Sequence, residues 1–95
     1  MSTNPKEIYR SLEEINKEAV IADGFEEAYI GYIRRSNKPT IAVYDYETCV
    51  EILMETESWD RKKAVNFMET GVVATWLGNS TPSFFFPVSG GEDDD

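Results

Sequence analysis

The sequence predicts a small α+β domain, in which an antiparallel β-hairpin and a C-terminal strand form a sheet packed against two to three helices. Segments rich in β-branched and aromatic residues lie at 28–34 and 40–45, with turn residues between them. Apolar residues recur with helical spacing over 46–57 and 60–77. Because a chain of 95 residues has room for one core, we expect a single domain over residues 1–89.

The first helix is predicted over residues 4–18. Asn4 is a typical N-cap, Pro5 suits the first helical position, and Glu7 completes a capping box. A break is expected at Asp23–Gly24. The predicted apolar side of this helix consists of Ile8, Tyr9, Leu12, Ile15 and Ala19.

The hairpin is predicted to turn through about four residues, 36–39, which have the sequence Ser-Asn-Lys-Pro. Gly31 lies inside the first strand, where a glycine indicates a bulge or a close neighbour above the backbone. Residues 83–88 are predicted to form the third strand, which returns to the sheet beside the hairpin.

The two later helices have clear start signals. Asp45 precedes the helix at 46–57 and is an ordinary N-cap, and Asp60 or Ser58 caps the helix at 60–77. Gly78 ends the last helix at the expected place.

The chain is strongly acidic, with 18 Asp and Glu, nine Lys and Arg, no histidine and a net charge of −9. Such a chain is not expected to bind nucleic acid through its phosphates, whereas a basic protein surface is a suitable partner. The absence of histidine excludes Cys-His and Ser-His nucleophiles and histidine-containing metal sites. Residues 90–95, with two glycines and four acids, are predicted to be a disordered acidic tail.

Cys49 is the single cysteine, so no internal disulfide is possible, and its place on a helix favours a small buried apolar side chain. No apolar run approaches the length that a membrane helix needs, and the polar N-terminus lacks the pattern of a secretory signal. These observations predict a cytoplasmic protein without membrane association.

Glu47, Glu51 and Glu55 are spaced at i, i+4 and i+8, which places them in one stripe on the helix at 46–57. One interpretation is a solvated outer face, and the other is a docking stripe for a partner with a basic surface. Carboxylates on a single helix do not converge, so we expect no metal there.

A ligand pocket is the second candidate site. Arginine with aromatic side chains would suit a phosphate-bearing nucleotide, and Asp45 with Glu69 would form a carboxylate pair if they met in a cleft. The alternative is that Asp45 only caps its helix. The candidate pocket residues are Arg34, Tyr44, Asp45, Glu69, Trp76 and Thr81.

Phe84, Phe85 and Phe86 follow one another in the third predicted strand, so Phe84 and Phe86 point to one face and Phe85 to the other. A domain of this size does not cover both faces, and an exposed apolar patch usually marks an interface. The sequence therefore predicts a homodimer that uses the sheet or this segment.

Several motifs together resemble a widespread group of small, uncharacterised proteins of phages and bacteria. The match covers about residues 23–86 and consists, in order, of G-Y-x-R, A-V-Y-D-Y, C-V-E-I-L-M-E, A-x-x-F-x-E and T-P-x-F. The resemblance implies a phage or bacterial origin and a place in the host cytoplasm. It implies no activity.

The sequence favours a non-enzymatic accessory protein that binds a host protein through an acidic surface, without a cofactor or a metal. The alternative is a small-molecule module that captures a nucleotide in the aromatic-arginine pocket.

Overall fold

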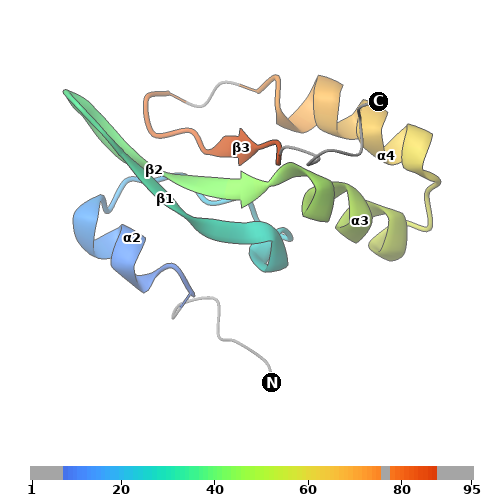
Figure 1. Cartoon of the computed structure of the whole chain (residues 1–95), viewed down its shortest axis with the longest axis horizontal. Coiled ribbons are helices and arrows are strands. Elements are labelled where there is room, and N and C mark those ends of the chain that lie inside the picture. The colour runs from blue at the N-terminus through green and yellow to red at the C-terminus, as the bar shows by residue number, and fades with distance from the viewer. Residues whose placement is uncertain (1–7, 76–77, 88–95) are drawn as a thin grey trace.

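The computed structural model describes residues 8–75 and 78–87, and it confirms the α+β fold (Figure 1). In chain order its elements are α2 (Arg10–Ile15), η1 (Glu26–Ala28), β1 (Tyr29–Arg35), β2 (Lys38–Asp45), α3 (Tyr46–Thr56), α4 (Arg61–Phe67), η2 (Met68–Val72) and β3 (Ser83–Phe85). Here η1 is a 3₁₀-helix and η2 is a π-helix.

The sheet is mixed and has the strand order β1-β2-β3. β1 and β2 form the predicted antiparallel hairpin, but β3 runs parallel to β2, so the expectation of an entirely antiparallel sheet is wrong at this strand. The physical reason is the connection, because α3 and α4 carry the chain away from β2 and return it in the same direction. β3 is also shorter than the predicted segment 83–88.

The hairpin turn is tighter than the predicted four residues. Arg35 pairs with Lys38, which leaves Ser36 and Asn37 as the two turn residues. Asn37 has a φ of 60°, a left-handed conformation that asparagine tolerates well. Lys38 and Pro39 therefore belong to β2, although the sequence places them in the turn.

Gly31 marks a β-bulge in β1. The pairing register shifts between Tyr29 and Gly31, and Gly31 has a φ of 145°. A Cβ atom added there would meet no other atom within 4 Å, so the backbone conformation rather than crowding favours glycine. The predicted bulge is confirmed.

The first helix ends at Ile15, three residues before the predicted end at residue 18. Asn16 is extended, and its side-chain amide donates hydrogen bonds to the Thr40 carbonyl (2.9 Å) and to Ser80 Oγ (3.2 Å). These tertiary bonds end the helix and leave Ile15 48% exposed, so its predicted place in the apolar face is wrong. The predicted cap residues Asn4, Pro5 and Glu7 lie outside the described residues.

Aspartates cap α3 and α4 as predicted. Asp45 accepts hydrogen bonds from the Thr48 backbone N–H (3.0 Å) and from Thr48 Oγ1 (2.7 Å), and Asp60 accepts one from the Lys63 N–H (2.9 Å). The helix after Asp60 is shorter than the predicted 60–77. It changes to the π form at Met68, where the Val73 N–H bonds the Met68 carbonyl at 2.7 Å.

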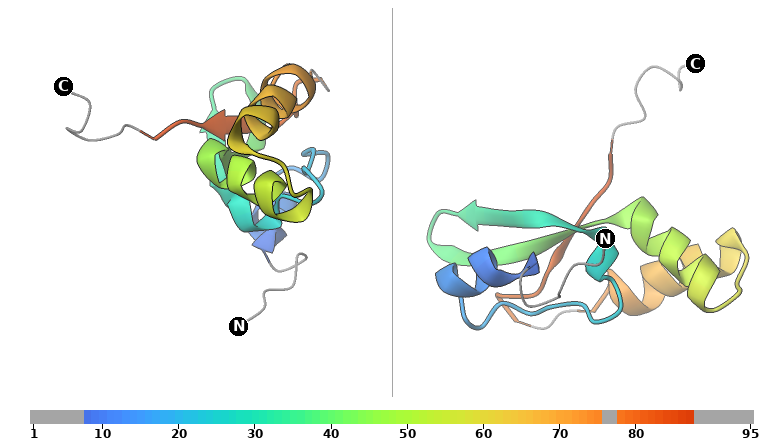
Figure 2. Two further views of the ribbon diagram at one scale, coloured as in Figure 1. Left: turned by 90° about the vertical axis from the view of Figure 1, so that its right-hand side faces the viewer. Right: turned by 90° about the horizontal axis from the view of Figure 1, so that it is seen from below.

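Tyr44 lies at the centre of the core and is fully buried. Its ring contacts Tyr29 and Phe84 from the neighbouring strands, with centroids 5.6 and 6.0 Å apart. Its hydroxyl bonds the Tyr9 hydroxyl (2.8 Å) and accepts the Ala22 N–H (2.9 Å). Figure 2 shows α2 and the segment 16–25 on one side of the hairpin.

Candidate partner-binding site

The three acids of the predicted stripe on α3 have different surroundings. Glu47 pairs with Arg61 of α4 at 2.9 Å, so its charge is balanced across the two helices. Glu51 and Glu55 are exposed. The sequence shows no basic residue on α3 itself, and Arg61 reaches Glu47 only because the helices fold back on each other.

Glu55 instead joins a groove between α3 and η1. The groove has a volume of about 290 Å³, and its lining residues are Gly24, Glu26, Glu27, Ile52, Glu55 and Thr56. It forms because α3 contacts η1, which brings together acids that are far apart in the sequence. The sequence analysis missed Glu26 and Glu27, although the pair next to Asp23–Gly24 is a local concentration of acid.

A tight turn positions the η1 side of the groove. Gly24 has a φ of 91°, and its N–H donates to a Glu26 carboxylate oxygen at 3.3 Å. Phe25 is buried in the core beside the turn, so η1 begins from a fixed point. The two acids of η1 are therefore presented from an anchored segment.

The groove combines three acidic side chains with the apolar side chain of Ile52. Within residues 8–75 and 78–87, no Lys or Arg nitrogen lies within 4.0 Å of a carboxylate oxygen of Glu26, Glu27 or Glu55. Ile52 is half-buried and lines the groove. A Lys or Arg side chain matches this arrangement, because its methylene stem packs on apolar surface while its head reaches carboxylates.

The described residues of the predicted nucleotide pocket have different surroundings. Tyr44 is buried in the core, and the Asp45 carboxylate is used as the α3 cap. Arg34 lies at the hairpin end in a shallow depression with Arg35 and Ser36, whereas Thr81 lines a different cavity. Trp76, the sixth predicted residue, lies outside the described residues.

Glu69 and Asp45 have different hydrogen-bond partners. The Tyr46 hydroxyl donates to Glu69 Oε2 at 2.6 Å. Burial and this neighbouring carboxylate raise the pKa of Tyr46 to about 12, so the phenol stays protonated and keeps the bond. The arrangement joins α3 to η2 and offers no separate acid and base.

Cys49 is fully buried on the inner face of α3, as predicted. Burial raises the pKa of its thiol to about 12, with a smaller contribution from Asp45. A thiol in this state is a small apolar side chain rather than a nucleophile.

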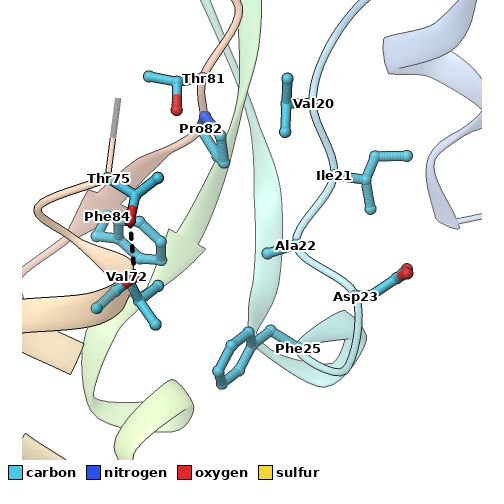
Figure 3. Close-up of a pocket in the computed structure, with 11 residues that line it drawn as sticks. Val20, Ile21, Ala22, Asp23, Phe25, Val72, Thr75, Thr81, Pro82 and Phe84 are labelled. Atoms are coloured by element: carbon cyan, nitrogen blue, oxygen red, sulfur yellow. Dashed lines mark hydrogen bonds between the residues drawn. The ribbon is translucent and has the colours of Figure 1, made fainter. Parts of the chain in front are cut away.

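A second cavity, of about 210 Å³, lies between the segment 20–25 and the region from η2 to β3 (Figure 3). Ala22 and Phe25 face it from one side, and Val72 and Phe84 from the other. Sequence analysis gave no sign of it, because its walls come from three separate stretches of the chain.

The described residues contain no group of three or more Cys, Asp and Glu side chains that would hold a metal ion. No described helix combines the length and the apolar character needed to cross a membrane.

No family model, curated protein or solved structure gives a significant match to this chain. The resemblance to a group of phage and bacterial proteins therefore stays a prediction.

Proposed function

We propose that this is a non-enzymatic binding protein that recognises a basic segment of another protein, and that the partner belongs to the host cell. The observation that carries the proposal is the groove between η1 and α3. Glu26, Glu27 and Glu55 surround it, and no basic side chain of the described residues balances them.

The contrast with Glu47 supports this proposal. Arg61 lies 2.9 Å from Glu47 and balances that charge within the molecule, so a partner would have to displace an existing pair. The groove acids lack such a competitor among the described residues. A cation from a partner protein would therefore gain charge-assisted hydrogen bonds without breaking an ion pair.

The predicted nucleotide function has less support. A nucleotide needs a base platform near its phosphate site, but none of the described residues that line the depression at Arg34 and Arg35 is aromatic. The Arg35 guanidinium is also used, because it donates to the carbonyls of Pro39 (2.7 Å) and Asn79 (2.9 Å).

The test is affinity capture from a bacterial lysate with three forms of the chain. Wild type should retain a basic protein that elutes as the salt concentration is raised, since salt screens exposed charges. The double variant Glu27→Gln/Glu55→Gln should lose it. Glu13→Gln/Glu18→Gln removes the same charge from exposed sites outside the groove and should retain it.

Equal capture by both double variants would contradict the groove as the binding site. Recognition through charge would be contradicted if wild type retained no specific protein. It would also be contradicted if the retained protein did not elute as the salt concentration is raised.

A further inference from the structure

We propose that the apolar cavity beside the groove receives a leucine, methionine or phenylalanine side chain of the same partner segment. The protein would then read a two-part motif, a basic residue followed or preceded at a fixed distance by a large apolar one. This inference rests on the proposed function, since it assigns the partner's second contact.

The two concave sites share one turn of the chain. Gly24 lines the acidic groove, while its neighbours Asp23 and Phe25 line the cavity. The turn itself is fixed by Gly24 and by the buried Phe25 ring. A single extended peptide that crosses this turn therefore reaches both sites, and the adjacent acids specify that the peptide is basic.

The cavity wall is apolar where Figure 3 shows side chains pointing into it. Ala22 and Phe25 face Val72 and Phe84 across the space. Asp23, Thr75 and Thr81 also line it, and the Thr75 hydroxyl donates its proton to the Gly71 carbonyl at 2.7 Å. An apolar group is suited to such a lining, because a polar one would lose its water partners on entry.

The volume limits the occupant to one side chain. The cavity measures about 210 Å³, compared with about 150 Å³ for an apolar protein cavity that accepts benzene. Pockets for whole ligands typically begin at about 300 Å³. A buried apolar anchor at the centre of a contact with charged surroundings is the usual arrangement of an interface hot spot.

The backbone on one wall is also unusual. Gly71 and Val72 lie in the π-helix η2, where the bonding pattern widens by one residue. π-helical turns are rare and frequently occur at functional sites. Val72 of this π-helix lies at the cavity in Figure 3.

The experiment uses an array of short peptides that carry either lysine or glutamine at one position and every amino acid in turn at a second position. Binding of wild type is compared with that of Ala22→Met, which fills the cavity but keeps the Ala22 N–H bond to Tyr44. Val72→Phe fills the same cavity from the opposite wall. Ala74→Met is the same alanine-to-methionine substitution at an exposed site outside the cavity lining, and it serves as the control.

Wild type and Ala74→Met should prefer Leu, Met or Phe at one offset from the lysine by about tenfold over Ala. Both filled variants should lose that preference and keep the preference for lysine. Glu27→Gln/Glu55→Gln should lose the preference for lysine and keep the preference for a large apolar residue.

Lysine preference without an apolar preference, or an apolar preference that survives both filling substitutions, would overturn this inference and leave the proposed function intact. Absence of any lysine preference would instead contradict the proposed function.

Discussion

At the scale of residues, the core contains hydrogen-bonded tyrosine side chains in addition to packed aliphatic ones. The Tyr44 hydroxyl joins the Tyr9 side chain to the backbone of Ala22, which connects the N-terminal helical region, the following segment and β2. Burial raises the pKa of both tyrosines above the ordinary phenol value. The neutral network is therefore the state that the fold stabilises.

Tyr44→Phe should lower the free energy of unfolding by about 1–3 kcal/mol, because it leaves the Tyr9 hydroxyl and the Ala22 N–H without their bonds in the core. Urea denaturation measures the change. The control is Tyr32→Phe, at a side chain that is 38% exposed, and it should stay within about 0.5 kcal/mol of wild type. Equal stability of the two variants would contradict the network's role.

Cys49 should be almost unreactive toward thiol reagents in the native protein at neutral pH. Its side chain is fully buried and its raised pKa keeps the thiolate fraction very small. Labelling should become rapid and complete in urea, which provides the control. Since the pKa is raised to about 12, increasing the pH toward the ordinary thiol value should accelerate native labelling far less than labelling of a free thiol. Fast native labelling would show that α3 exposes this residue.

At the scale of elements, the junction between β2 and α3 is the point where the sheet is joined to the helices. Asp45 is both the last residue of β2 and the N-cap of α3, so one side chain fixes the place where the strand becomes a helix. Cys49, Val50 and Leu53 of α3 enter the core, and Glu55 borders the acidic groove. The position of the groove therefore depends on this junction.

Asp45→Ala should destabilise the protein by about 0.5–2 kcal/mol, because the Thr48 N–H loses its capping acceptor. Asp45→Asn keeps a capping oxygen and should retain most of the stability. Thermal or chemical unfolding followed by circular dichroism measures both variants. If Asp45→Ala and Asp45→Asn were equally stable, the cap would not determine the start of α3.

At the scale of the whole molecule, the two faces of the sheet differ. The pairing register places Tyr29, Tyr44 and Phe84 on the core face, and it places Ile33 and Phe85 on the opposite face. Ile33 and Phe85 remain 43% and 47% exposed. Figure 2 shows no described helix over that side of the hairpin.

We expect a second copy of the chain to cover that face, as the sequence predicts. Residues 28–44 carry three basic side chains and no acid, so they contribute +3, and the remainder contributes −12 to the net charge of −9. A two-fold contact that places each hairpin end over the acidic body of its mate would be complementary.

We expect light scattering at micromolar concentration to give at least twice the chain mass of 10.8 kDa. Phe85→Glu should shift the protein to monomer, because an unpaired charge is costly to bury at a symmetric contact. Ile15→Glu alters a side chain of similar exposure on α2 and should leave the mass unchanged. A wild-type monomer across this range would contradict the interface.

Local features of this protein were predictable from the sequence because short-range forces determine them. The caps Asp45 and Asp60, the bulge at Gly31 and the extent of α3 each depend on residues within one turn or one strand. Helix capping satisfies backbone N–H groups within one turn of the cap residue, and the φ preference of glycine belongs to the single residue.

Contacts between residues far apart in the sequence determined the end of α2, the direction of β3 and the candidate site. Asn16 ends α2 by bonding Thr40 and Ser80, and β3 is parallel because of where α4 returns the chain. The candidate site has the same origin, since Glu27 and Glu55 meet only when η1 packs on α3. Sequence patterns encode the faces of single elements, whereas a groove between two elements exists only once they are packed, and so the tertiary structure alone revealed it.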